Sequence, residues 1–171
     1  EGNLKIAVPK EIEQLRYRPF KAENLEIDAD SDVLVEGISG DSLELALDVD
    51  QGLAIEFGLK VCVSPDGEEQ TIISYDAVQG ELKVDTQRSG LERAPMAVER
   101  APFMLDENER LRLRVFIDKS VVEVFANDRQ AVARRIYPAR SDSLGVRIFS
   151  VGGSAKVKLL ESWHISPANP Y

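Results

Sequence analysis

Alternate carboxylates form the most metal-like pattern in this sequence. Asp28, Asp30 and Asp32 are spaced like the first ligands of a calcium-binding loop, in which carboxylate oxygens hold the cation. The continuation does not fit, because such a loop needs a glycine at its sharp turn and a glutamate at its closing position. Val33 and Ser39 stand there instead. We therefore expect a solvated loop between two strands, and we assign neither a metal nor a cofactor to the chain.

The only histidine and the only tryptophan are neighbours near the end of the chain. A lone histidine, His164, excludes mechanisms within this chain that need a pair of histidines, such as multi-histidine zinc sites. An exposed or edge position is favoured for it over a catalytic one. Trp163 has two interpretations: a core residue that completes the alternation of Val157 and Leu159, or a platform for stacking on a sugar ring. The core is favoured, with sugar binding as the alternative.

Paired carboxylates are the third kind of site to test. Cleavage of a glycosidic bond with retention needs two carboxylates about 5 to 5.5 Å apart, one of them with a raised pKa. Asp118 and Glu123 are the nearest such pair, but turn formation accounts for Asp118. An ion pair with Arg114 on the neighbouring strand is expected to account for Glu123. No catalytic residue is therefore assigned.

The elements that must position these side chains are β-strands, most clearly at 111–118 and 122–126. Apolar residues alternate along both segments. Pairing Ile117 with Val122 keeps apolar residues opposite one another, whereas a slip of one residue would set Glu123 at a core position. The register of this hairpin is therefore predicted.

Short apolar runs separated by Gly, Pro, Asp and Ser clusters recur along the whole chain. They predict an all-β protein, specifically a two-layer antiparallel β-sandwich of jelly-roll or concanavalin-like type. The predicted strands are residues 25–27, 33–36, 42–49, 54–63, 70–75, 81–85, 111–118, 122–126, 131–137, 144–151 and 155–165.

Turns and helical segments are predicted at only a few places. Helical turns are expected at 11–16 and at 23–24. Because 118–121 has no Gly or Asn, a four-residue loop is expected there instead of a two-residue turn. Gly152 and Gly153 are expected to form a tight hairpin.

Length, charge and cysteine count limit the classes of function. A chain of 171 residues suits one domain with its own core, and Cys62, its only cysteine, is expected to be a buried apolar residue. A formal net charge of −9 with scattered Lys and Arg argues against nucleic acid. No apolar run reaches the roughly 18 residues of a membrane span, and no signal peptide is recognised. The chain is expected to be a piece of a longer one, and its compartment stays open.

On these residues the chain resembles the C-terminal module of glycoside hydrolase family 32, which includes invertases, levanases and inulinases. The strongest motif is Leu-Arg-Val-Phe-Ile-Asp-Lys-Ser at 113–120, then Val-Glu-Val-Phe-Ala-Asn-Asp at 122–128 and Arg-Ile-Tyr-Pro at 135–138. Shorter matches are Leu-Lys-Val-Asp at 82–85, Arg-Ser-Gly at 88–90 and Ser-Trp at 162–163.

The resemblance implies a two-domain enzyme that hydrolyses fructosyl bonds in sucrose or fructans with retention. An N-terminal five-bladed β-propeller would carry catalysis, and this β-sandwich would pack on it. The catalytic strings of the family, Trp-Met-Asn-Asp-Pro-Asn, Arg-Asp-Pro and Glu-Cys, do not occur in the sequence. Residues 1–20 resemble the passage from the propeller and are expected to be a junction segment, with residues 21–171 as the β-sandwich domain.

The expected role is therefore a non-catalytic accessory domain that stabilises the propeller. Ile6, Val8, Ile12 and Leu15 are hard to bury within the sandwich, so they are expected to contact the propeller. The alternative is a carbohydrate-binding module that holds fructan, with Trp163 as the candidate sugar contact. It has less support, because aromatic residues make up only 6% of the chain and binding faces usually present several.

Overall fold

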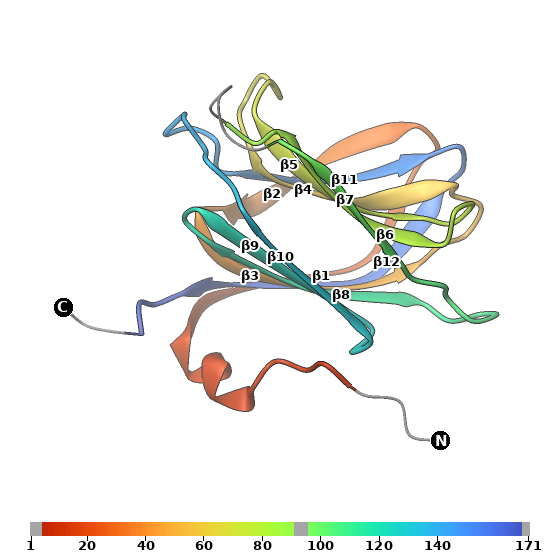
Figure 1. Ribbon diagram of the computed structural model, residues 1–171, viewed down its shortest axis with the longest axis horizontal. Helices are drawn as coiled ribbons and strands as arrows, with labels where there is room; N and C mark the ends of the chain where they lie inside the picture. Colours follow the sequence, from red (N-terminus) through yellow and green to blue (C-terminus); the bar gives the residue numbers. More distant parts are fainter. Residues whose placement is uncertain (1–4, 91–95, 169–171) are drawn as a thin grey trace.

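Two antiparallel β-sheets stacked face to face form the structure, a computed structural model that describes residues 5–90 and 96–168 (Figure 1). Sheet A has the strand order β1-β12-β3-β8-β9-β10, and sheet B has the order β2-β11-β4-β5-β6-β7. The strands are β1 Arg16–Ile27, β2 Ser31–Ser39, β3 Ser42–Asp50, β4 Glu56–Val63, β5 Gln70–Asp76, β6 Glu81–Arg88, β7 Val98–Pro102, β8 Leu111–Asp118, β9 Val121–Ala126, β10 Gln130–Arg135, β11 Gly145–Val151 and β12 Ala155–Ile165.

The predicted two-layer antiparallel sandwich is thereby confirmed. A short 3-10 helix, η1 (Lys10–Leu15), precedes β1 and agrees with the helical turn expected there. No helix in the described parts of the chain is long and apolar enough to cross a membrane.

The core lies between the sheets because apolar residues alternate along each strand. On β8 the residues at alternate positions from Leu111 to Ile117 are at most 2% exposed, and on β3 those from Leu43 to Val49 are at most 4% exposed. Sheet B contributes residues such as Phe57, Leu59, Val61, Ile73, Leu82 and Val84. Cys62 is buried next to them, as predicted.

The β8–β9 hairpin has the predicted register, with Ile117 opposite Val122. The predicted four-residue loop is wrong, since Lys119 and Ser120 alone connect the strands. Lys119 adopts a φ of 53°, which is unusual for a side chain of its size. Its backbone N–H donates to the Asp41 carbonyl at 2.7 Å and its ammonium contacts the Asp41 carboxylate at 2.8 Å. These contacts hold the turn without glycine.

Two other elements differ from prediction. β7 was not predicted, because it is an edge strand with Glu99, Arg100 and Pro102 among its five residues and so lacks apolar alternation. β1 begins at Arg16 instead of residue 25, and the helical turn predicted at 23–24 is wrong. Asn24 lies within the strand with a φ of 54°, as does Arg18 with a φ of 49°.

The hairpin predicted at the glycine pair is also wrong. β11 belongs to sheet B and β12 to sheet A, so residues 152–154 carry the chain from one sheet to the other. The crossing is tight: a Cβ on Gly153 would lie 2.1 Å from the Leu53 carbonyl oxygen. Glycine is needed for the close approach of two backbones.

Candidate functional site

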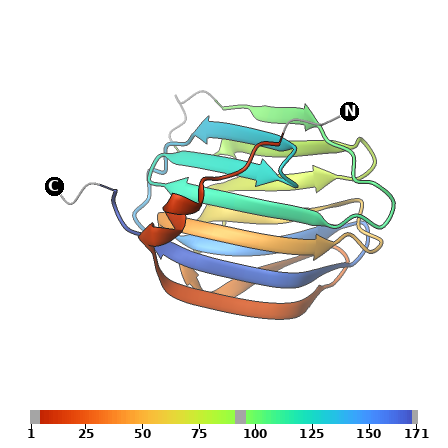
Figure 2. The ribbon, with the colours of Figure 1, turned by 90° about the horizontal axis from the view of Figure 1, so that it is seen from below.

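The outer face of sheet A, which points away from the core, is crossed by the N-terminal segment. Figure 2 shows this segment and η1 lying over the strands of sheet A before the chain enters β1. The Ile6 backbone N–H donates to the Asp128 carbonyl at 2.9 Å, which fixes the segment to the β9–β10 turn. Part of this face is therefore covered by the chain's own first described residues.

Trp163 lies on this outer face, so the prediction of a core position is wrong. The pairing of β12 with β3 shifts register just before Leu159, which reverses the alternation and turns Leu160 and Ser162 toward the core. Trp163 is half-buried, and the Arg16 guanidinium lies 3.9 Å from its ring centroid. This stacked cation covers one face of the indole.

A buried carboxylate lies beside this tryptophan. Glu44 points to the outer face of β3, yet it is 0% exposed. Its Oε2 accepts from Arg16 Nε at 2.8 Å, and its Oε1 accepts from Arg16 Nη2 at 2.6 Å and Arg114 Nε at 2.5 Å. Burial alone would raise the pKa of Glu44, but the two guanidinium groups outweigh it and lower that pKa.

The predicted Arg114–Glu123 ion pair does not form. Arg114 turns to β3 and pairs with Glu44 instead, although Glu123 lies opposite Phe116 in the predicted register. Sequence reasoning did not find Glu44 as a member of this site. The one available signal was a charged residue within the apolar run of β3, since its two partners are 28 and 70 residues away along the chain.

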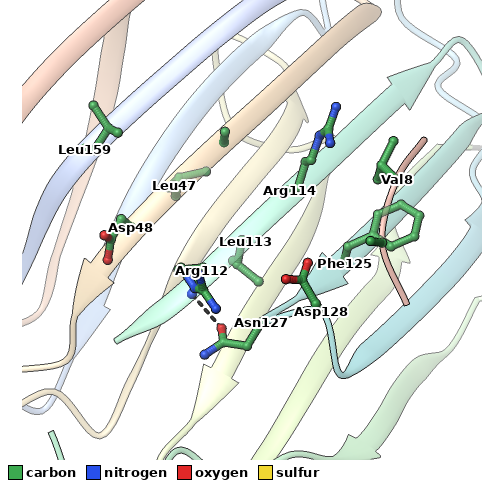
Figure 3. A pocket seen from close by; sticks show the side chains of 12 residues that line it. Val8, Leu47, Asp48, Arg112, Leu113, Arg114, Phe125, Asn127, Asp128 and Leu159 are labelled. Atoms are coloured by element: carbon green, nitrogen blue, oxygen red, sulfur yellow. Dashed lines mark hydrogen bonds between the residues drawn. The ribbon is translucent and has the colours of Figure 1, made fainter. Parts of the chain in front are cut away.

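A groove of about 320 Å³ lies between the N-terminal segment and sheet A (Figure 3). In Figure 3 the Val8 side chain lies beside Phe125, and Arg112, Arg114 and Asp128 are further side chains of the lining. The lining residues are Ala7, Val8, Ala46, Leu47, Asp48, Arg112, Leu113, Arg114, Phe125, Asn127, Asp128 and Leu159.

Two polar atoms of this groove are buried without a hydrogen-bond partner among the described residues. They are Arg114 Nη2, a donor, and Asp48 Oδ1, an acceptor. The other oxygen of Asp48 lies 3.2 Å from Arg110 Nη1. Buried polar atoms in folded proteins nearly always have partners, and each exception needs an explanation. The lining of the groove therefore contains one buried donor and one buried acceptor that no described residue satisfies.

The four predicted interface residues all lie outside the core. Ile6 is 37% exposed, and Val8, Ile12 and Leu15 are half-buried in the segment and in η1. Val8 also lines the groove, so the structure brings it together with Arg114 and Asp48. The contact of these residues with another domain stays a prediction.

The acidic and histidine candidates are not assembled into a site. Asp118 lies in the turn opposite Val121, at a different level from Glu123. Asp30 accepts from the Gly152 N–H at 2.8 Å, and Asp32 lies in β2, where it forms ion pairs with Lys60 and Arg147. No cluster of three His, Cys, Asp or Glu side chains suited to a metal occurs in the residues that the structure describes.

His164 does not occupy the expected edge position. β12 lies between β1 and β3, and the imidazole is half-buried with its centroid 5.4 Å from the Tyr17 ring. The ring contact accounts for its position.

Residues 11–164 match the profile of the family described as glycosyl hydrolases family 32 C terminal. The chain therefore belongs to the C-terminal domains of glycoside hydrolase family 32, as the sequence motifs predicted.

Relatives include a levanase of Bacillus subtilis, 38% identical over 169 residues, which covers 94% of this chain and 24% of the levanase. A sucrose-6-phosphate hydrolase of Zymomonas mobilis is 30% identical over 132 residues, covering 74% of this chain and 25% of that protein. The chain thus spans about a quarter of the length of these relatives.

Solved structures show the same fold. Fructan 1-exohydrolase IIa of Cichorium intybus superposes with a TM-score of 0.79 at 20% identity, over 94% of this chain and 37% of that one. A fructosyltransferase of A. japonicus also gives 0.79, at 21% identity, over 90% of this chain and 27% of that one.

Proposed function

We propose that this chain is the non-catalytic C-terminal domain of a retaining fructosyl-bond hydrolase that acts on sucrose or fructans. It packs on the N-terminal catalytic domain of the same polypeptide, a five-bladed β-propeller by the family resemblance, and stabilises it. The observation that carries this proposal is the groove over sheet A, with its unpartnered Arg114 donor and Asp48 acceptor.

The state of the carboxylates supports a non-catalytic role. A catalytic acid needs a raised pKa and a partner carboxylate at the right distance. Glu44, the most buried acid of sheet A, instead has a lowered pKa and is engaged by two guanidinium groups. The family's catalytic strings are absent from the 171 residues.

The composition of the groove defines the contact that the catalytic domain would make. Val8 and Phe125 offer apolar area for the contact. Arg114 Nη2 needs a carbonyl or carboxylate oxygen as acceptor, and Asp48 Oδ1 needs an N–H or O–H group as donor. A loop of the catalytic domain supplies both from its peptide groups. An interface core of this kind, with apolar area around satisfied polar groups, is typical of stable contacts.

The test is a charged substitution in the groove of the polypeptide that carries both domains. Val8→Asp should lower the melting temperature of the catalytic domain and accelerate loss of sucrose hydrolysis on heating, because it replaces apolar contact area with a carboxylate that docking would have to desolvate. The matched control is Leu53→Asp, at a residue that is 82% exposed and outside the groove. Equal melting temperatures for both variants and the wild type would overturn the docking surface.

A further inference from the structure

A second cavity, of about 520 Å³, lies at one end of the sandwich. Asp41 of the β2–β3 turn, the β8–β9 turn and the loop 137–144 form its walls, and it shares no lining residue with the groove over sheet A. Its size falls within the roughly 300–1,000 Å³ of small-molecule sites. Cys62 lines it from below, and burial raises the pKa of this thiol to about 12, so the thiol stays neutral.

The walls combine opposite charges with hydroxyl groups. Lys119 Nζ lies 2.8 Å from Asp41 Oδ1, and both side chains remain open to solvent, at 66% and 46% exposed. Ser120, Ser141 and Tyr137 add hydroxyl groups, and Tyr137 also adds an aromatic ring. Arg140, the third charged residue of the lining, is paired with Asp66 and Asp142, so no charged group of the walls lacks an opposite charge and the cavity favours neither an anion nor a cation.

One hydroxyl group of the cavity has no partner. Ser143 is 2% exposed, and its Oγ makes no hydrogen bond within the described residues. A buried hydroxyl without a partner is unfavourable by itself, so its presence at a cavity wall points to a ligand that completes it.

The loop that carries Ser143 is held in a fixed shape. The Glu69 carboxylate accepts from the backbone N–H groups of Ala139 at 2.8 Å and Arg140 at 3.3 Å. The Arg140 guanidinium in turn contacts Asp66 and Asp142 at 2.5 and 2.8 Å. Fixing the loop beforehand reduces the entropy that a ligand would otherwise have to overcome.

We propose that this cavity binds a neutral saccharide. A sugar offers many hydroxyl groups that both donate and accept, which matches the Asp41–Lys119 pair and the serine hydroxyls, while Tyr137 contacts its C–H face. The ligand carries no net charge, in keeping with the balanced walls. This inference goes beyond the docking role and does not depend on it.

The test uses the 171-residue chain, titrated by calorimetry with sucrose and with a short levan oligosaccharide, and with maltose for comparison. We expect saturable binding of at least one of these neutral sugars with a dissociation constant of about 1 mM. Absence of saturable heat from every sugar up to about 50 mM would overturn the proposal.

Two substitutions locate the binding. Asp41→Asn and Ser143→Ala should each weaken it by about tenfold, because each removes a hydrogen-bonding group. Ser143→Ala should leave the melting temperature of the empty chain unchanged or raise it, since the lost hydroxyl has no protein partner. A purely structural serine would give the opposite result.

The matched controls sit away from the cavity. Ser150, 1% exposed, donates to the Gly153 carbonyl at 2.6 Å, so Ser150→Ala should lower the melting temperature and leave sugar binding intact. Glu23 forms an exposed pair with Lys21 at 2.7 Å, so Glu23→Gln should change neither. Sugar binding that persists in both Asp41→Asn and Ser143→Ala would overturn the site. Because the chain alone is used, this outcome would leave the docking proposal standing.

Discussion

The two faces of sheet A differ in the kind of residue that buries them. On β3, Leu45 and Glu44 are neighbours with the same 0% exposure, one facing sheet B and the other facing outward. Leu45 is buried by apolar residues of the two sheets, whereas Glu44 is buried by two arginines from β1 and β8. The inner face is complete within this chain, and the outer face retains unpartnered atoms at Arg114 and Asp48. Full burial of a residue therefore does not show that every polar atom on the same face of the sheet has a hydrogen-bond partner.

The largest expected effect is on the inner face. Leu45→Ala should lower the free energy of unfolding by about 3 kcal/mol, because it removes apolar contacts and leaves a cavity that the sheets cannot close. Chemical denaturation of the chain alone measures this. Leu53→Ala, at an 82% exposed position, should change it by less than about 0.5 kcal/mol. A loss below about 1 kcal/mol for Leu45→Ala would contradict the assigned core.

A smaller loss is expected on the outer face. Glu44→Gln should lower the free energy of unfolding by about 2 kcal/mol, because it leaves two guanidinium groups without their carboxylate. Both arginines are partly exposed, at 19% and 23%, so solvent reduces the effect below that of a fully buried pair. Glu123→Gln, on the same face, is the control and should have little effect. Equal losses of free energy of unfolding for Glu44→Gln and Glu123→Gln would instead support an Arg114–Glu123 ion pair.

The pH dependence of stability should separate the two faces. The pKa of Glu44 is lowered in the folded state from an ordinary value of 4.5, so its contribution is fully present above that pH. It is lost as the pH falls through the folded-state pKa. The difference in melting temperature between wild type and Glu44→Gln should therefore be largest near neutral pH and shrink in acid. The difference in melting temperature between wild type and Leu45→Ala should stay constant. If both differences shrank together in acid, the result would argue against an ionised Glu44.

The smallest effect is expected at an exposed ion pair of the same sheet. Lys21 and Glu23 contact each other at 2.7 Å with 56% and 54% of their side chains exposed. Lys21→Met should leave the free energy of unfolding nearly unchanged, since water screens the pair. A loss as large as that for Glu44→Gln would show that burial does not distinguish the two pairs.

The inner face was the part that sequence predicted well. Alternation is a local property, so it predicted the strands around the core, the register of β8 with β9 and the buried Cys62. The family motifs lie largely on these same strands. Edge strand β7 was not predicted because its charged residues and proline leave no apolar alternation in the sequence.

The outer face escaped prediction because its contacts are not local. A register shift in β12 turned Trp163 outward, and no feature of the residues around it signals that shift. The partners of Glu44 come from β1 and β8, far away along the chain. Lys119 takes a conformation that glycine usually supplies, because Asp41 holds it from another turn.

Hydrogen–deuterium exchange tests most directly the claim that the outer face of sheet A docks on the catalytic domain. Exchange is compared between this chain alone and the same chain joined to that domain. The account predicts slower exchange, on joining, in residues 5–15, β8 and β9, with β5 and β6 of sheet B unchanged. Protection confined to sheet B, or no change at sheet A, would contradict it.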